Sequence, residues 1–253
     1  MALLKCWWKF DEAAGSPTAY EYISSNHAQL SVVSGYPRFV PGFAGIGIEG
    51  NGAVWNTGGH LICDKVAYDL CSLADPHSFT FWLKLPVGAA RNRVIFTPWF
   101  GSPTPFATNP IYVDSSGYVR YGVSYYSQLT LVRETVSTGI DLRDGEWHFY
   151  AVTFYSDPGR ANCNQKIYVD GQLKGTLTPN PLLQVSSETR DGHTWWILNG
   201  YLVGFPINAA YGFGGTLQGI LDDLRFYCGE LGPDEVFPPV PPKISSIMFS
   251  CNT

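Results

Sequence analysis

A β-hairpin is encoded in residues 166–176, which read KIYVDGQLKGT. Two short alternating runs flank Asp170-Gly171, and this dipeptide favours the two-residue turn whose twist matches that of the strands. A second hairpin is predicted where residues 111–113 and 118–123 flank the segment 114–117, DSSG. Its final glycine accepts the positive φ that such a connection needs. Both hairpins predict antiparallel β-structure.

The rest of the chain has the same character. Residues 146–154, EWHFYAVTF, are apolar on both faces, as is typical of a central strand covered on both sides. With 253 residues, of which 45% are hydrophobic and 15% charged, the chain can bury the large core of a single all-β domain. Short alternating runs between Gly, Pro, Asn and Asp recur, whereas no helical periodicity lasts three turns. The sequence therefore predicts an all-β domain.

Charge and cysteine content define the expected setting. The net charge is -5 and the cations are scattered singly, so we expect no nucleic-acid partner. No apolar run is long enough for membrane insertion or for a signal peptide, which predicts synthesis in the cytoplasm. The cysteines lack CxxC or zinc spacing, and we expect all of them to be reduced and structural. They are Cys6, Cys63, Cys71, Cys163, Cys228 and Cys251.

Two segments near the ends of the chain look like paired strands. Residues 7–15 read WWKFDEAAG, and residues 219–227 read GILDDLRFY. If they pair antiparallel with position numbers that sum to about 234, their apolar residues share the inward face. The predicted pairs are Cys6 with Cys228, Trp8 with Phe226, and Phe10 with Leu224.

Five motifs in order resemble the laminin-G-like group of the concanavalin A-like lectin/glucanase superfamily. The match spans residues 5–236, which we take with the first residues as one domain, 1–236, followed by a Pro-rich tail, 237–253. The resemblance implies a jelly-roll β-sandwich of two antiparallel sheets, one of them concave. It also implies a protein that binds glycans or proteins and that often carries a structural Ca²⁺. The motifs are WKFDEAAG (8–15), FTFW (79–82), GEWHFYAVTFY (145–155), KIYVDGQLKGT (166–176) and GTLQGILDDLRFY (215–227).

The predicted strand register turns Asp222 inward. The hypothesis of a bound metal ion starts from this buried carboxylate. A buried carboxylate needs backbone N–H donors, a basic partner or a cation, because an unpartnered charge is costly to bury. Ca²⁺ takes hard oxygen ligands. Turn amides and Ca²⁺ remain alternative partners for Asp222. The predicted ligands of the structural Ca²⁺ are Asp11, Asn26, Asn51 and Asp222, together with carbonyls of the glycine-rich segment 41–52.

Catalytic patterns of the superfamily are not found. Its glucanases carry a Glu-x-Asp-x-x-Glu strand whose carboxylates act as nucleophile and acid. Glu134 has no carboxylate two or five positions later, and Asp222-Asp223 point to opposite faces of a strand. His148 beside Trp147 is interpreted as a packed or hydrogen-bonded residue. No GxSxG or HExxH motif occurs, so we predict a protein that is not an enzyme.

Two aromatic-rich segments, residues 97–106 and 191–201, carry the binding hypothesis. Aromatic rings stack on sugar faces, while Asn and His bond hydroxyls. Packing of these rings in the core is the alternative interpretation. Trp99 and Trp195 are the residues we expect to be exposed. The predicted ligand-binding residues are Trp99, Phe100, Tyr125, Tyr126, His193, Trp195, Trp196 and Asn199.

The Pro-rich tail, residues 237–253, suggests a second kind of function, in an assembly of subunits. Its Pro-rich start is expected to be extended, and the apolar residues 244–251 either form a mobile linker or dock onto a neighbouring subunit. We therefore predict a structural surface component of an assembly, such as a phage particle, that also adheres to glycans. A free-standing carbohydrate-binding lectin module is the alternative, and a glycan-active enzyme ranks third.

Overall fold

All regular elements in the described part of the chain are β-strands. The computed structural model describes residues 1–53, 59–66, 75–99, 110–127, 130–157, 162–178, 193–198 and 215–237. The backbone alone is described for residues 64–66, 98–99, 123–127, 130–134 and 193–196. No helix in these ranges is long and apolar enough to cross a membrane.

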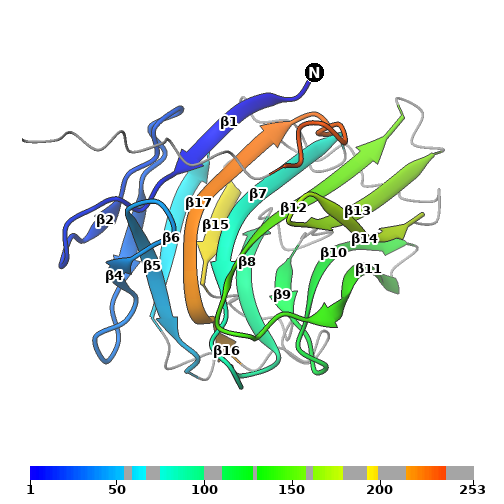
Figure 1. Ribbon diagram of the computed structural model, residues 1–253. Coiled ribbons are helices and arrows are strands. Elements are labelled where there is room, and N and C mark those ends of the chain that lie inside the picture. The colour runs from blue at the N-terminus through cyan, green and yellow to red at the C-terminus, as the bar shows by residue number, and fades with distance from the viewer. Residues whose placement is uncertain are drawn as a thin grey trace, which may run out of the picture.

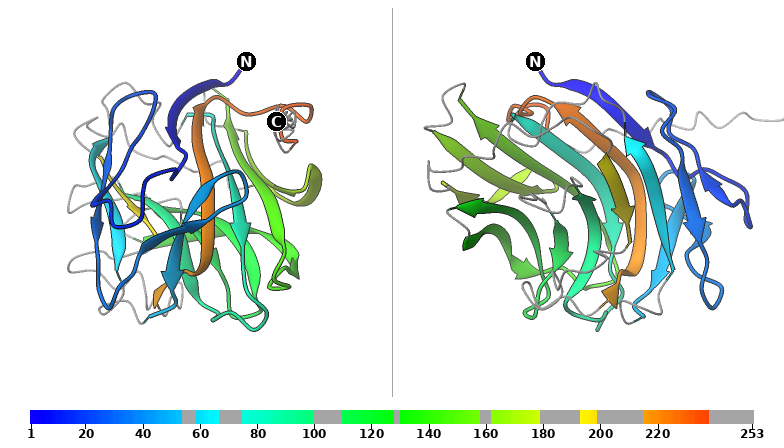
Figure 2. Two further views of the ribbon diagram at one scale, coloured as in Figure 1. Left: turned by 60° about the vertical axis from the view of Figure 1, so that its left-hand side comes forward. Right: turned by 180° about the vertical axis from the view of Figure 1, so that it is seen from behind.

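The strands form two sheets that pack face to face as an all-β jelly-roll sandwich (Figures 1 and 2). The eight-stranded sheet has the order β14-β13-β12-β7-β17-β5-β4, and β1 also pairs with β17. Its strands are β1 (Leu3–Trp8), β4 (Arg38–Pro41), β5 (Ile46–Asn51), β7 (His77–Lys84), β12 (Trp147–Ser156), β13 (Cys163–Val169), β14 (Gln172–Leu177) and β17 (Gln218–Cys228).

The nine-stranded sheet lies behind it in Figure 1, with the order β11-β10-β9-β8-β15-β6-β3-β2. Its ninth strand, β16, pairs with β8 in parallel. These strands are β2 (Thr18–Ala19), β3 (Ala28–Ser31), β6 (His60–Val66), β8 (Arg93–Trp99), β9 (Ile111–Val113), β10 (Tyr118–Ser127), β11 (Thr130–Asp141), β15 (His193–Ile197) and β16 (Gly215–Thr216).

Strand β12 is central, as its apolar sequence predicts. It pairs with β13 on one side and with β7 on the other. Tyr150, Val152 and Phe154 lie in the core between the sheets, whereas Phe149 and Ala151 belong to a second apolar cluster. Because both faces of the strand are buried, its side chains do not alternate between apolar and polar.

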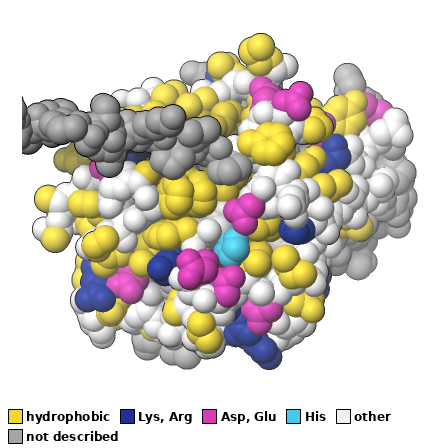
Figure 3. Space-filling view, viewed as in Figure 1, with side chains coloured by type: hydrophobic (Ala, Val, Ile, Leu, Met, Phe, Trp, Pro, Cys, Tyr) yellow, Lys and Arg dark blue, Asp and Glu magenta, His cyan; other side chains and the backbone are white. Residues whose placement is uncertain are grey.

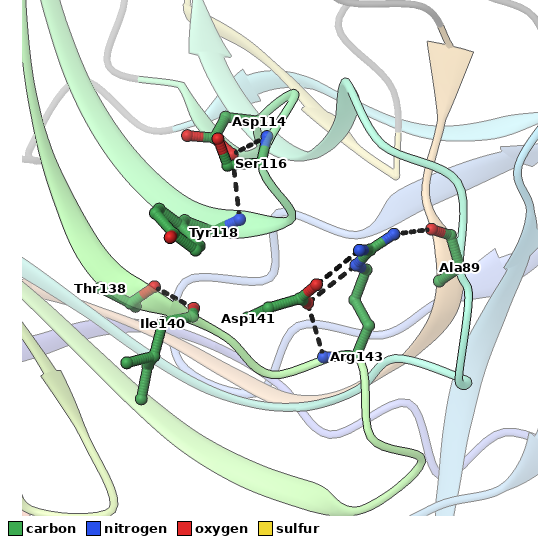
Figure 4. Close-up of polar contacts among 8 residues, drawn as sticks. All are labelled: Ala89, Asp114, Ser116, Tyr118, Thr138, Ile140, Asp141 and Arg143. Carbon is green, nitrogen blue, oxygen red and sulfur yellow. Dashed lines mark hydrogen bonds and ion pairs between the residues drawn. The ribbon is translucent and has the colours of Figure 1, made fainter.

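Both predicted hairpins are present. Asp170 and Gly171 have φ values of 50° and 78°, which the two-residue turn between β13 and β14 requires. In the turn before β10, Asp114 Oδ1 accepts hydrogen bonds from the amides of Ser116 and Tyr118 (Figure 4). Gly117 supplies the positive φ, 89°.

The connection from β11 to β12 is fixed at the same end of the sandwich. The guanidinium of Arg143 donates to both carboxylate oxygens of Asp141 and to the carbonyl of Ala89, at 2.5 to 2.8 Å (Figure 4). The side chain of Arg143 therefore joins this connection to the one between β7 and β8.

The two end strands pair as expected, but the predicted register is wrong by two residues. Cys6 lies opposite Phe226 and Trp8 opposite Leu224, after a register shift between Leu4 and Cys6. A displacement of two residues keeps every side chain on its face. Cys6 and Trp8 are therefore fully buried, because the alternating pattern determines the face but not the pairing partner.

Asp222 is buried, but not toward the core as predicted. The pairing of β17 with β7 shifts between Asp222 and Arg225, and Asp223 has a φ of 53°. This bulge lets Leu221 and Leu224 both face the core. Asp222 lies opposite Trp82 on the other face of the sheet, with 2% of its surface exposed.

The expectation that every cysteine is reduced is wrong at Cys228. Cys6, Cys63 and Cys163 are free and buried. Cys228 is disulfide-bonded, and its partner lies outside the described residues. Disulfide formation depends on proximity in the folded chain, which the spacing of cysteines along the sequence does not reveal. Residues 238–253 of the predicted tail also lie outside the described residues.

Candidate functional site

The outer face of the eight-stranded sheet carries a second apolar cluster. Figure 3 shows hydrophobic side chains gathered on this face. Two of the cluster's members come from the segment 229–237, which follows β17 and packs back onto the sheet. The hydroxyl of Ser78 donates to the carbonyl of Gly229 and accepts from the amide of Leu231, both at 3.0 Å. The outer cluster consists of Trp82, Phe149, Ala151, Tyr168, Leu231 and Val236.

A second cover over this face is the loop between β4 and β5. The ring of Phe43 stacks on Trp82, with centroids 3.5 Å apart. Asp222 Oδ2 accepts hydrogen bonds from the amides of Phe43 and Ala44, at 2.8 and 3.2 Å. Burial raises the pKa of Asp222 to about 6, although these amides act in the opposite direction. Backbone amides thus supply the partners that the buried carboxylate needs.

The predicted Ca²⁺ ligands lie in three places. Asp11 contacts the same loop as Asp222, because its Oδ1 accepts from the amide of Ile46 at 3.1 Å. Asn26 Nδ2 donates to Ser24, and Asn51 Oδ1 accepts from Ala53 at the far end of β5. Across the described ranges, no group of three or more His, Cys, Asp or Glu is placed to hold a metal. Of the four predicted ligands, Asp11 and Asp222 both contact the loop between β4 and β5, and the Ca²⁺ assignment stays a prediction.

The predicted aromatic residues fall mainly on the nine-stranded sheet. Trp99 of β8 lies opposite Thr194 of β15, and Trp195 lies opposite Pro98, so the two tryptophans occupy neighbouring strands. Their side chains are not among those described, and their binding role stays a prediction. Of the others, His193 and Trp196 lie on β15, Tyr125 and Tyr126 lie on β10, and Phe100 and Asn199 lie outside the described residues.

A different aromatic surface is exposed beside β1. Tyr20 and Tyr22 are 48% and 51% exposed, and the half-buried Trp7 lies beside Tyr22, with ring centroids 6.3 Å apart. The Tyr20 ring also meets His27 edge-on, with centroids 4.9 Å apart. We define the β1 surface as Trp7, Lys9, Glu12, Tyr20, Tyr22 and Arg225.

Glu21 fixes the backbone that displays the two tyrosines. Its carboxylate is 2% exposed and accepts five hydrogen bonds. Hydrogen bonds to charged groups are stronger than neutral ones, so the loop is held in one conformation. The donors are the amides of Trp7, Ile23, Ser24 and Asn26 and the hydroxyl of Ser24, at 2.6 to 3.3 Å.

The ring of Trp7 is held by charged neighbours. Lys9 Nζ lies 4.2 Å from the Trp7 centroid and 4.7 Å from that of Tyr22. The guanidinium of Arg225 lies 4.7 Å from Trp7, and Asp223 accepts from both the indole Nε1 and Arg225. Such cation–π contacts contribute about 0.5–1 kcal/mol at exposed sites. These contacts hold the Trp7 ring in one orientation at the β1 surface.

The carboxylate of Glu12 is a hydrogen-bond acceptor within the β1 surface. It is 7% exposed, and its Oε1 accepts from the amide of Tyr20 at 2.8 Å. Its Oε2 is buried and has no hydrogen-bond partner among the described residues. Burial raises the pKa of Glu12, with the charge of Asp11 adding to the effect.

Sequence reasoning missed this surface. Residues 20–23, YEYI, alternate aromatic or aliphatic side chains with a glutamate. Such a short run does not tell which side chains face outward. One feature of the sequence could have indicated this surface. In an alternating run, burial of Glu21 requires both neighbouring tyrosines to face outward.

His148 joins two turns at one end of the sandwich. Its Nδ1 lies 2.7 Å from Asp170 Oδ2 and its Nε2 lies 3.1 Å from Asp144 Oδ2. Burial lowers the pKa of His148, but hydrogen bonds to Asp170 and Asp144 outweigh it and give a net increase. The interpretation of His148 as a hydrogen-bonded residue is confirmed.

The two packed sheets define an all-β jelly-roll sandwich. Residues 65–237, more than half of the chain, match the family model described as the concanavalin A-like lectin/glucanases superfamily. This protein belongs to that superfamily. A comparison with curated proteins finds no match.

Solved structures share the fold. Domain 4 of AbnA, an extracellular arabinanase of Geobacillus stearothermophilus solved with arabinotriose, aligns with a TM-score of 0.61 and 16% identity over 93% of this chain and 97% of that chain. Botulinum neurotoxin type C, whose cell entry depends on interaction with two ganglioside molecules, aligns with a TM-score of 0.56 and 16% identity over 92% of this chain and 50% of the toxin chain. A Trypanosoma rangeli sialidase gives 0.54 and 13% over 91% and 31%. At these identities the likeness shows the fold alone.

Proposed function

We propose that this protein is a non-catalytic carbohydrate-binding domain and that the β1 surface is its contact region. The observation that carries this proposal is the exposure of Tyr20 and Tyr22 on a backbone that Glu21 fixes with five hydrogen bonds. Aromatic rings offer apolar area to sugar faces. A loop that is already ordered loses little conformational entropy when a ligand binds.

The chemistry of the surface supports binding over catalysis. Glycoside hydrolysis needs two carboxyl groups free to act on one bond. Here Glu21 is saturated by amide and hydroxyl donors, and Asp223 is engaged by Trp7 and Arg225. The nearby carboxylates of Asp11 and Glu12 each accept from a backbone amide, of Ile46 and Tyr20. Neighbouring folds include the arabinotriose-bound arabinanase domain, which supports the carbohydrate class by analogy.

A glycan array probed with the whole protein tests the proposal. We expect the wild type to bind a defined group of glycans and Tyr22→Ala to weaken that binding at least tenfold. Leu173→Ala serves as the matched control, because Leu173 is 53% exposed on β14, outside the β1 surface. Binding by Tyr22→Ala at the wild-type level, or no glycan binding by the wild type, would contradict the proposal.

A place in a larger assembly, such as a phage particle, remains a prediction. Phe237 is 56% exposed where the Pro-rich tail begins. If the tail docks onto a neighbouring subunit, removal of residues 238–253 will prevent incorporation into the assembly while glycan binding is kept. Incorporation of the shortened chain at the normal level would refute the docking role.

A further inference from the structure

The β2–β3 hairpin at the edge of the nine-stranded sheet places polar and aromatic side chains on its outward face. Ala19 pairs with Ala28, and both are fully buried. Side chains alternate along a strand, so those next to the two alanines point outward. On one side of this pair, the rings of Tyr20 and His27 meet edge-on, with centroids 4.9 Å apart. We define the hairpin face as Thr18, Tyr20, His27 and Gln29.

The backbone holds the imidazole of His27 in one tautomer. The amide of Glu21 donates to His27 Nδ1 at 3.1 Å. A ring nitrogen that accepts carries no proton, so in the neutral imidazole the proton is on Nε2. His27 is exposed, and its Nε2 makes no hydrogen bond within the described ranges. The Nε2–H group is therefore a donor that is open to a ligand, next to the exposed ring of Tyr20.

Gln29 supplies a second oriented donor. Its Oε1 accepts from the hydroxyl of Thr18 at 3.2 Å, which turns the NH2 group of the same amide away from Thr18. His27 and Gln29 are two positions apart in the extended segment of β3, so their Cα atoms are about 7 Å apart. The hairpin face thus offers two donors beside one exposed aromatic ring.

The charges around the hairpin face favour a neutral ligand. The face contains no Lys or Arg, and Lys9 lies against Trp7 and Tyr22 instead. The carboxylate of Glu12 bonds the amide of Tyr20 at 2.8 Å. An anion would therefore meet negative charge without a cation to offset it. Sugar hydroxyl oxygens are neutral acceptors, which suits donors that carry no charge.

Tyr20 also keeps open surface for a sugar ring. An edge-on contact covers at most one face of one of the two rings, and 48% of Tyr20 is exposed. Glu21 fixes both sides of the hairpin face, because its amide bonds His27 and its carboxylate bonds the amides of Ile23 and Ser24. A ligand that binds there orders little of the protein.

We infer that the hairpin face orients a neutral sugar, with one sugar oxygen accepting from His27 Nε2, a second accepting from the Gln29 amide, and the apolar sugar face packing on Tyr20. This inference rests on the proposed function, and it makes His27 and Gln29 the specificity-determining residues. Both protein groups donate, so the two sugar oxygens that they contact act as acceptors.

NMR of the imidazole nitrogens in the whole protein tests the tautomer. The measurement is made at about pH 8, where an ordinary imidazole is neutral. We expect the proton of His27 on Nε2, and we expect the Nε2 signal to shift when arabinotriose, lactose or cellotriose binds. A proton on Nδ1 would overturn the inference.

Variants tested by isothermal titration with the same sugars separate the two ring nitrogens. Asn at position 27 keeps an acceptor near the place of Nδ1 but has no group at Nε2, whereas Gln reaches the place of Nε2. We expect His27→Asn and Gln29→Leu each to weaken binding about fivefold, and His27→Gln to weaken it less. Gln172→Leu is the matched control, because Gln172 is exposed on β14 and its Oε1 also accepts from a neighbour.

The outcomes separate this inference from the proposed function. If a neutral sugar binds and Tyr22→Ala weakens its binding, but His27→Asn and Gln29→Leu change affinity less than twofold, the inference is overturned and the proposed function stands. Tighter binding of sialyllactose than of lactose, or a larger loss in His27→Gln than in His27→Asn, also overturns it. If no sugar binds the wild type, both fail. Should His27→Asn not fold, Gln29→Leu and the tautomer decide.

Discussion

Two aromatic regions, the outer cluster on the eight-stranded sheet and the β1 surface, differ in what covers them. In the outer cluster, Trp82 lies beneath Phe43 and the segment 229–237, and 7% of its surface is exposed. In the β1 surface, Tyr20 and Tyr22 are about half exposed, although their backbone is fixed by Glu21. Aromatic content therefore does not mark a binding site by itself. The proposed binding role of the β1 surface therefore rests on the exposure of its rings and on the hydrogen bonds that fix their backbone.

The largest expected effect separates the two regions by stability. Trp82→Ala removes a ring stacked on Phe43 within a closed cluster, so we expect a loss of about 3–5 kcal/mol in the free energy of unfolding. Tyr22→Ala should change it by less than about 0.5 kcal/mol, because surface substitutions are mild. Urea unfolding measures both, and equal losses would abolish the distinction.

A pH effect arises in the core between the sheets. His77 Nε2 lies 2.6 Å from the Tyr121 hydroxyl, and burial lowers the pKa of His77 to about 4. The unfolded chain binds this proton near pH 6.5, so stability is complete above that pH and falls by roughly 3 kcal/mol as pH decreases toward 4. Asp222 titrates with the opposite sign, because its raised pKa favours the folded state at low pH.

The Asp222→Asn background removes one of the titrations that oppose His77. The raised pKa values of Glu12 and Asp223 still act against it. Unfolding free energies measured between pH 7 and 4 should fall more steeply in Asp222→Asn than in the wild type, and equal slopes in the two proteins would contradict the raised pKa of Asp222.

Glu21 links the backbone of the β1 surface to its binding. Glu21→Ala leaves four amides without their acceptor, and we expect about 2 kcal/mol of lost stability together with weaker glycan binding. Hydrogen exchange of residues 20–26 should accelerate. Unchanged exchange would show that Glu21 does not fix the loop.

The smallest expected effect concerns His148. Only the imidazolium donates from both nitrogens, so one of the two contacts, to Asp170 or to Asp144, is lost as pH rises through the raised pKa of His148. Stability that is complete below pH 6.5 should decrease by less than about 1 kcal/mol above it. His148→Gln, which does not titrate, should lack this decrease in urea unfolding.

The sequence predicted the fold because hairpin turns and apolar alternation are local. The Asp170-Gly171 turn and the central position of β12 are confirmed. It could not predict the bulge at Asp223, which moves Asp222 to the outer face. A bulge depends on how β17 aligns with its neighbour β7, and alternation along one strand does not determine that alignment. It also missed the roles of Glu12 and Glu21, since burial of a carboxylate depends on amides brought together by folding.

Binding at the β1 surface is tested most directly by an NMR titration of the whole protein with a neutral sugar, such as arabinotriose, that follows backbone amide shifts. We expect the shifts to concentrate in residues 7–12 and 20–27, and we expect residues 229–237, which cover the outer cluster, not to respond. Shifts confined to β8 and β15, or to the segment 229–237, would contradict it.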